Sequence, residues 1–178
     1  MQKHFPNILS LSRIPLSLLL WPLVDSPVCF TAVVLLIGIT DVADGYLARK
    51  YQCTTKTGAK LDSVADFVFF TVIVIILVVH YRPIVYGIRF LVLAVACIRL
   101  LSLVVCYFRF RELAFIHTIG NKLTGGVIYL SILLLPFALP VFVFRVVISI
   151  ALLTAIEELL IMLTDKELNL NRKSIFLK

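Results

Sequence analysis

The chain has 178 residues, of which 61% are apolar and 15% charged, and its formal net charge is +7. A soluble domain of this size cannot bury so large an apolar fraction, whereas a lipid bilayer can cover it, so the composition indicates a membrane protein. The hydropathy excludes a free nucleic-acid-binding protein, and the basic charge is typical of a chain that contacts anionic headgroups or phosphorylated substrates.

About six apolar runs are long enough to cross a bilayer as helices, which need roughly 20 residues each. They cover approximately residues 8–24, 28–47, 61–79, 84–107, 123–140 and 141–163. Prolines predict kinks in the first and fifth runs, and the turn between Pro136 and Pro140 fits on either side of the last boundary. We expect an all-α fold, a polytopic membrane protein with about six transmembrane helices that forms a single domain over residues 1–178.

Residues 1–7 precede the first run and are expected to form a short N-terminal interfacial helix, with a frayed terminus as the alternative. The connections between the runs alternate in charge. Residues 49–60, residues 109–122 and the C-terminal tail are basic, whereas the turns around Asp25 and after Pro136 contain no Lys or Arg. The positive-inside rule therefore predicts a multi-pass protein of the cell membrane with both termini in the cytoplasm.

Four carboxylates lie at the facing ends of the second and third runs. Asp41 and Asp44 are three residues apart and therefore share one face of a helix. Asp62 and Asp66 are four residues apart and share a face in the same way. The two helices are antiparallel neighbours across the loop 50–57, so we expect the four carboxylates to lie together near the cytoplasmic surface.

Four like charges in a low-dielectric site must be neutralised by protons or by cations. Oxygen-only ligands suit a hard cation such as Mg²⁺ or Mn²⁺, and two such ions can share the carboxylates and clamp a diphosphate. The pattern therefore predicts a two-ion site. The alternative is that the carboxylates reach to the membrane surface or pair with Arg49 and Lys60.

Small residues flank these acids. Gly45 and Gly58 lie close to them along the helices and let a ligand approach the backbone. The small side chain of Ala48 also leaves room for a ligand, and Arg49, at the cytoplasmic end of the run, can pair with a phosphate. The full spacing is Asp-x2-Asp-Gly-x2-Ala-Arg-x8-Gly-x3-Asp-x3-Asp, filled by Asp41, Asp44, Gly45, Ala48, Arg49, Gly58, Asp62 and Asp66. This pattern resembles the signature of the CDP-alcohol phosphotransferase family, with every fixed position filled.

The resemblance implies the transfer of a phosphatidyl group from CDP-diacylglycerol to the hydroxyl of a small polar alcohol, with release of CMP. It implies that Asp66 takes the proton of the acceptor hydroxyl. Two Mg²⁺ or Mn²⁺ ions would be held by Asp41, Asp44, Asp62 and Asp66. The binding site for the CDP-lipid would be lined by Gly45, Ala48, Arg49 and Gly58. The family also implies a homodimer. An active site at the bilayer interface, facing the cytoplasm, suits a reaction between one lipid and one water-soluble substrate.

A weaker element opens the first run. Asn7, Ser10 and Arg13 resemble the family pattern Asn-x2-Thr-x2-Arg, with Ser10 keeping the hydroxyl of the usual Thr. The three lie close to one helix face. We expect them either to touch the phosphates of the CDP-lipid or to support the acids, and the alternative is anchoring at the membrane interface.

Two basic residues are candidates for binding the acceptor. Arg99 falls in the cytoplasmic half of the fourth run, where it can pair with the acids or bind an acidic acceptor, with snorkelling as the alternative. Lys122 and Thr124 stand at a helix start that suits a phosphate, loosely similar to a segment of phosphatidylglycerophosphate synthases, or else they anchor the interface. Arg89 falls near the outer end and is expected to snorkel. No role is predicted for Glu157 or Glu158.

The acceptor itself is predicted from subfamily resemblance. The segment 61–67 resembles phosphatidylserine synthases in its pattern Asp-Ser-x-Ala-Asp, and Arg99-Leu100 in the fourth run resembles them too. Ser63 and Phe67 stand where phosphatidylglycerophosphate synthases tend to have Pro and Lys. The short chain and the region of Lys122 are more similar to the glycerophosphate enzymes, and phosphatidylinositol-phosphate synthases share the core motif. We expect serine as the acceptor, with glycerol 3-phosphate or inositol phosphate as the alternative.

Two other classes of protein carry acids in membrane helices. A transporter commonly consists of two related halves, and no internal repeat is visible in this sequence. An inactive scaffold that kept the fold is disfavoured because every motif position is filled. An enzyme is therefore the leading interpretation.

Overall fold

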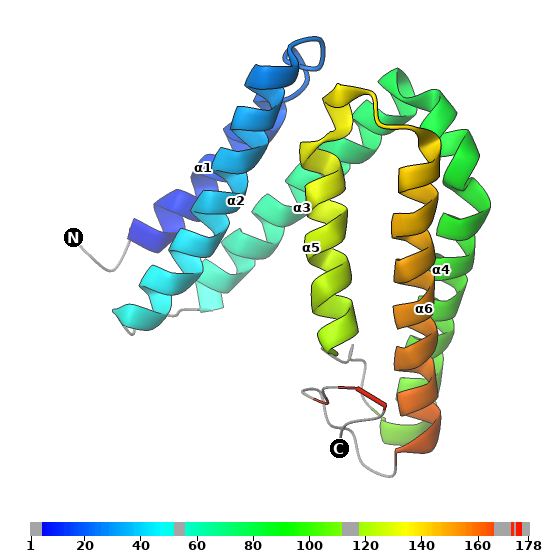
Figure 1. The fold of residues 1–178 in the computed structure, drawn as a ribbon. Helices are drawn as coiled ribbons and strands as arrows, with labels where there is room; N and C mark the ends of the chain where they lie inside the picture. The colour runs from blue at the N-terminus through cyan, green and yellow to red at the C-terminus, as the bar shows by residue number, and fades with distance from the viewer. Residues whose placement is uncertain (1–4, 52–55, 112–117, 166–171, 173, 176–178) are drawn as a thin grey trace. The chain divides into compact units, whose positions relative to one another are not determined.

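A computed structural model describes residues 5–51, 56–111, 118–165, 172, 174 and 175. The elements follow in the order α1 (Phe5–Leu19), α2 (Pro27–Lys50), α3 (Lys56–His80), α4 (Arg82–Phe110), α5 (Ile119–Leu133), the short 3-10 helix η2 (Leu135–Phe137) and α6 (Val141–Thr164) (Figure 1). The described part of the chain contains no β-strand, which confirms the all-α prediction.

Within the described residues, four helices are long and apolar enough to cross a membrane. The spans are Pro27–Leu47, Lys60–His80, Arg82–Phe110 and Val141–Thr164. Helices α1 and α5 have only 15 residues each, fewer than the roughly 20 that a straight transmembrane helix needs. The prediction of several membrane helices is thus confirmed, while the first and fifth helices are shorter than expected.

The short helices end where proline and tight turns interrupt the backbone hydrogen bonds. Past α1, the N–H of Leu20 donates to the carbonyl of Ser17 at 3.1 Å, a 3-10-type bond, and Pro22 follows. Helix α5 ends at Leu133 rather than at Pro140, because Pro136 lies in η2 and Ala138 adopts a left-handed backbone with φ of 51°. At the N-terminus, residues 5–7 form the first turn of α1, and the rest of the expected interfacial segment lies outside the described residues.

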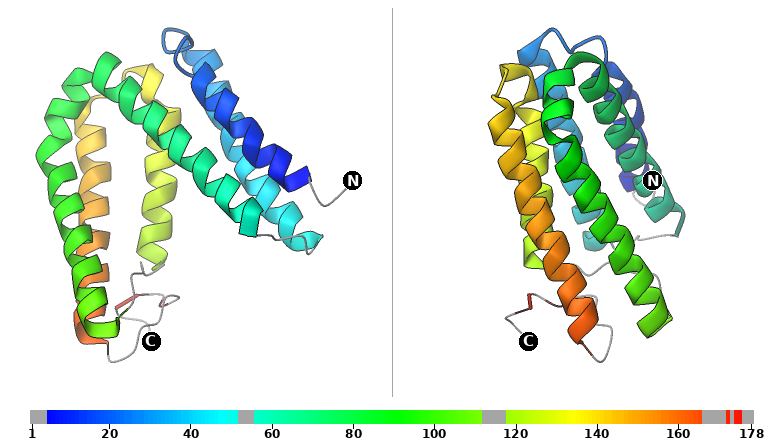
Figure 2. Two further views of the ribbon diagram at one scale, coloured as in Figure 1. Left: turned by 180° about the vertical axis from the view of Figure 1, so that it is seen from behind. Right: turned by 90° about the vertical axis from the view of Figure 1, so that its right-hand side faces the viewer.

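The chain divides into two compact units. The first comprises residues 1–82 and 132–139, and the second comprises residues 83–131 and 140–178. In the first unit, α1 packs against both α2 and α3 (Figures 1 and 2). Segment 132–139 joins α2 through η2, and the hydroxyl of Thr31 donates to the carbonyl of Leu133 at 3.1 Å.

Each helix of the first unit buries one stripe at helical spacing. In α2 and α3 the stripes are mainly apolar, formed by Phe30, Val34, Ile37, Ala65, Phe69, Ile73 and Ile76. The stripe of α1 is different, because Ser10, Arg13 and Ser17 are buried in it ahead of Leu20. A buried polar stripe on a membrane helix requires polar partners on the neighbouring helices, and α2 and α3 supply them.

The second unit contains α4, α6 and most of α5, and Figure 2 shows α4 and α6 running side by side in both views. Close approach of α4 and α6 depends on Gly87, where an added Cβ would lie 2.3 Å from a methyl group of Val141. Arg145 Nε donates to the carbonyl of Gly87 at 3.1 Å. Helix α5 meets α6 through the hydroxyls of Thr124 and Thr154, 3.3 Å apart.

Candidate metal and substrate site

One guanidinium group contacts all four predicted site carboxylates. Arg13 Nη1 donates to Asp41 Oδ1 and to Asp66 Oδ1, each at 2.6 Å. Arg13 Nη2 donates to Asp44 Oδ2 at 3.0 Å and also to Asp62 Oδ1. The structure therefore brings together the four acids that the spacing grouped into two pairs, and Arg13 of α1 is the residue that joins the pairs.

Burial across this cluster is graded. The side chain of Arg13 is 2% exposed and that of Asp44 is 7% exposed, whereas Asp41, Asp62 and Asp66 are 52%, 44% and 48% exposed. The inner side of the cluster thus consists of Arg13 and Asp44, and the outer side consists of the three half-exposed acids. A ligand would reach the outer side first.

Ser10 completes the inner side. Its hydroxyl donates to Asp44 Oδ2 at 2.7 Å, so this buried carboxylate is held by two residues of α1. Of the two roles expected for Ser10 and Arg13, the geometry places both in contact with the acids. Arg13 Nε is buried and has no hydrogen-bond partner within the described residues.

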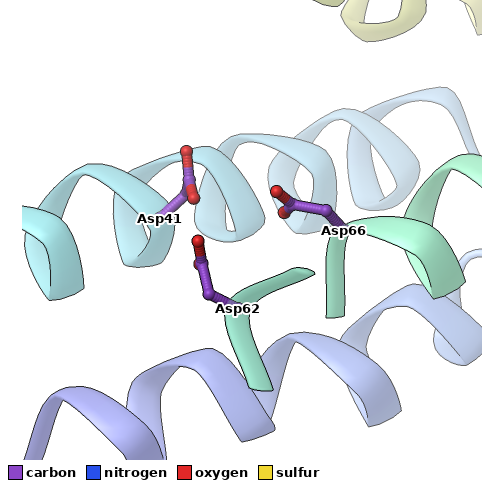
Figure 3. Close-up of side chains that lie close together, drawn as sticks. All are labelled: Asp41, Asp62 and Asp66. Carbon is purple, nitrogen blue, oxygen red and sulfur yellow. The ribbon is translucent and has the colours of Figure 1, made fainter. Parts of the chain in front are cut away.

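The three outer acids form a candidate ligand set for a cation. Asp41, Asp62 and Asp66 each present one carboxylate oxygen, and these oxygens all lie within 4.8 Å of one another. Figure 3 shows the three side chains projecting from α2 and α3 into the same space. The donors are oxygen only, as Mg²⁺ and Mn²⁺ prefer. Four carboxylates against one guanidinium leave three negative charges in the cluster, so the residues fit one or two divalent cations.

The CDP-alcohol phosphatidyltransferase family model matches residues 3–163. This chain belongs to the CDP-alcohol phosphatidyltransferase family. The match runs through both compact units and contains the whole acidic cluster. The family resemblance on residues 41–66 is thereby confirmed and extended over nearly the whole chain.

Curated relatives give a narrower comparison. The chain is 44% identical over 59 residues to the CDP-diacylglycerol–glycerol-3-phosphate 3-phosphatidyltransferase of Haemophilus influenzae, an alignment that covers 33% of this chain and 32% of the relative. Proteins of the same name from Sodalis glossinidius and Escherichia coli K12 are 36% and 35% identical over 87 residues, covering 46% of this chain and 48% of each relative. The chain thus spans less than half the length of these relatives. No solved structure matches the chain.

The remaining family positions in the first unit lie on the same two helices as the acids. Gly45 follows Asp44 in α2, and Gly58 stands one turn before Asp62 in α3. The side chains of three other predicted residues lie outside the described part of the structure: Asn7, Ala48 and Arg49. Their predicted roles stay predictions.

The second unit has its own ion pair, in which the acid is buried and the arginine is partly exposed. Arg99 Nη1 in α4 donates to Glu158 Oε2 in α6 at 3.2 Å, and Arg99 Nη2 donates to Asn121 Oδ1 at 3.2 Å. Asn121 Nδ2 in turn donates to Glu158 Oε2 at 2.9 Å. Glu158 is fully buried, so Arg99 has a structural partner that the sequence left unassigned. The available signal was a pair of opposite charges inside two apolar runs.

Lys122 and Thr124 differ in exposure although both lie near the start of α5. Lys122 is exposed, whereas Thr124 is buried against Thr154. Thr124 therefore contributes to helix packing rather than to a surface site. Glu157 also has partners, in the C-terminal tail. Its Oε1 accepts hydrogen bonds from the hydroxyl of Ser174 and from the backbone N–H of Ile175.

Proposed function

We propose that this chain transfers the phosphatidyl group of CDP-diacylglycerol to a hydroxyl of glycerol 3-phosphate and releases CMP. The observation that carries the proposal is the convergence of three carboxylate oxygens within 4.8 Å in a chain matched over residues 3–163 by the phosphatidyltransferase family. The acceptor follows from the relatives, whose names specify glycerol 3-phosphate. They support the alternative acceptor of the sequence analysis rather than serine.

The four acids are proposed to hold two divalent cations, Mg²⁺ or Mn²⁺. When bound, such ions neutralise the diphosphate of the CDP-lipid and the charge that develops on the transferred phosphoryl group. The outer acids are half exposed, which supports their proposed contact with a diphosphate. Ser10 and Arg13 hold Asp44 on the inner side. The CDP-lipid would lie along the helix faces that carry Gly45, Ala48, Arg49, Gly58 and Asn7, whereas Ser10 is buried and would act on the lipid only through Asp44.

Asp66 is proposed as the general base. Its Oδ1 accepts from Arg13, so we assign Oδ2 to take the proton of the acceptor hydroxyl. The hydroxyl oxygen forms a bond to the phosphorus on the lipid side of the diphosphate, the bond from that phosphorus to the bridging oxygen breaks, and CMP leaves with the bridging oxygen. Arg13 keeps the Asp66 carboxylate aimed from α3 towards the other acids.

Binding of the acceptor is assigned to Arg99 and Lys122. Glycerol 3-phosphate carries a phosphate, for which a guanidinium and an ammonium are suitable partners. Arg99 is held by Glu158 and Asn121 and keeps a partly exposed side chain, while Lys122 is exposed. We further propose that the protein is a homodimer in the cell membrane with its site towards the cytoplasm, as the basic connections favour.

The proposal is tested by CMP release from CDP-diacylglycerol in detergent micelles with Mn²⁺. Glycerol 3-phosphate, serine and inositol phosphate are supplied separately, and the lipid product is identified by mass. We expect product with glycerol 3-phosphate and at least about a hundredfold less with serine, because a site that binds a phosphate discriminates strongly against an acceptor without it. Inositol phosphate keeps a phosphate on a larger alcohol, so product with it instead of glycerol 3-phosphate would contradict the proposed acceptor. Product with serine alone would restore the first expectation, and no product with any acceptor would refute the enzyme.

A further inference from the structure

The position of Arg13 has a consequence for how the acidic cluster binds cations. The guanidinium donates to one oxygen of each of the four acids, and these include the three acids whose oxygens lie close enough to share an ion. A divalent ion held by the same carboxylates would coordinate their oxygens directly. It would therefore share its ligands with Arg13 and lie close to the guanidinium charge.

A divalent cation and a guanidinium that share carboxylate ligands repel each other strongly, because the effective dielectric of a protein is low. Arg13 cannot relieve the repulsion by losing its proton, because an arginine remains charged in proteins. Its side chain is 2% exposed, so water screens it little. The free protein must therefore bind divalent ions less tightly than four carboxylates without an arginine would.

Binding of the substrate would strengthen the binding of divalent ions. The diphosphate of a CDP-lipid brings negative charge to the outer side of the cluster, where Asp41, Asp62 and Asp66 are half exposed. That charge offsets the repulsion from Arg13 and supplies further oxygen ligands for the ions. Ion binding and nucleotide binding would then strengthen each other.

We propose that Arg13 is a built-in counter-cation that keeps the acids assembled without metal and weakens divalent-ion binding to the free enzyme, so that tight ion binding requires the diphosphate of the substrate. Arg13 is thus a positioning residue for the acids rather than a catalytic residue. The inference rests on the proposed function for the identity of the diphosphate ligand. The contacts of Arg13 with the four acids do not depend on which alcohol is the acceptor.

The test compares Mn²⁺ binding by the wild type, Arg13→Met and Arg13→Lys in detergent. Binding is measured by equilibrium dialysis, with and without CDP on both sides of the dialysis membrane. Without CDP, Arg13→Met should bind Mn²⁺ at least about tenfold more tightly than the wild type, since one repulsive charge is gone. Arg13→Lys keeps the charge and should stay within about threefold of the wild type. Addition of CDP should tighten Mn²⁺ binding by the wild type more than by Arg13→Met.

The outcomes are distinguishable from failure of the proposed activity, because Mn²⁺ binding is measured without turnover. Equal or weaker Mn²⁺ binding by Arg13→Met, or equal tightening in Arg13→Lys, would overturn the proposal even if CMP release is intact. Thermal unfolding in EDTA provides the second readout: Arg13→Met should unfold at a lower temperature, and Mn²⁺ should raise that temperature more than in the wild type. If Arg13→Met does not fold, Arg13→Gln replaces it, because Gln keeps a donor for the acids but removes the charge.

Discussion

Arg13 Nη2 lies 3.0 Å from Asp44 Oδ2, and both side chains are buried. A buried carboxylate that lost its cationic partner would have to be neutralised or hydrated. The pair therefore ties the sequence of α1 to the acids of α2, and through the other contacts of Arg13 to α3. It explains why the first helix of the unit packs a polar stripe inwards.

Asp66 can be separated from the other acids by its predicted chemistry. Asp66→Asn keeps the shape of the side chain but removes the base, so turnover should fall by about 10²–10⁴-fold. CDP-lipid binding should stay within about threefold of the wild type, because Asn keeps a carbonyl oxygen as a ligand at this position and the other three acids are unchanged. Kinetics of CMP release and a binding titration with CDP-diacylglycerol check the two expectations. Loss of lipid binding with residual turnover would show that Asp66 is not the base.

Asp41 should matter for binding rather than for proton transfer. Asp41→Ala removes one of the three outer oxygens, so Mn²⁺-dependent binding of CDP should weaken by at least about tenfold. The matched control is Asp25→Ala, which removes an exposed acid of the same unit from the turn before α2. Isothermal titration with CDP in Mn²⁺ and in EDTA measures both variants. Unchanged affinity for Asp41→Ala would remove this residue from the ligand set.

The ion pair of Arg99 with Glu158 should contribute to stability of the second unit. Arg99→Met leaves Glu158 buried without its charged partner and should lower the free energy of unfolding by about 3–5 kcal/mol. The double variant Arg99→Met with Glu158→Leu removes both charges and should recover part of that loss. Denaturant unfolding in micelles measures the cycle. If the two losses simply add, the pair contributes no coupling and Arg99 is held by other contacts.

Lys122 should affect the acceptor and not the lipid. Lys122→Ala removes an exposed ammonium from α5, so the KM for glycerol 3-phosphate should rise by about tenfold or more while the KM for CDP-diacylglycerol changes little. Arg89→Gln is the control, because it removes one positive charge from a residue with no proposed role in acceptor binding. The Cζ atom of Arg89 lies 5.5 and 4.7 Å from the ring centroids of Tyr86 and Phe90. A rise of the same size in the control would point to general charge rather than to a site.

The fold was largely predictable because hydrophobic runs separated by proline and charge determine where membrane helices begin and end. The grouping of the acids was predictable for the same local reason, since separations of three and four residues fix a shared helix face. The shorter α1 and α5 were not expected, because run length alone overlooks where Pro22 and Pro136 permit only tight turns.

The central position of Arg13 could not be derived from spacing. Its partners lie 28 to 53 residues away along the chain, and only the packing of α1 against α2 and α3 brings them together. The sequence predicted support of the acids as one of two roles, without the partners. Glu158 was missed for a similar reason, because its partner Arg99 lies 59 residues away on another helix.

The acceptor was predicted from positions that face away from the cluster. Ser63 and Phe67 are four residues apart on an exposed face of α3, whereas Asp62 and Asp66 share a neighbouring face that meets Arg13. The identity of two exposed residues gives no geometric reason to choose serine over glycerol 3-phosphate.

The central claim is that the converging acids form a divalent-ion site for phosphatidyl transfer. The most direct measurement is CMP release with glycerol 3-phosphate after complete removal of metal by EDTA, followed by stepwise return of Mn²⁺, for the wild type and Asp62→Asn. We predict no release without metal, full recovery in the wild type, and at least about a hundredfold lower activity in Asp62→Asn at every Mn²⁺ concentration. Release that persists in EDTA, or undiminished activity in Asp62→Asn, would contradict the account.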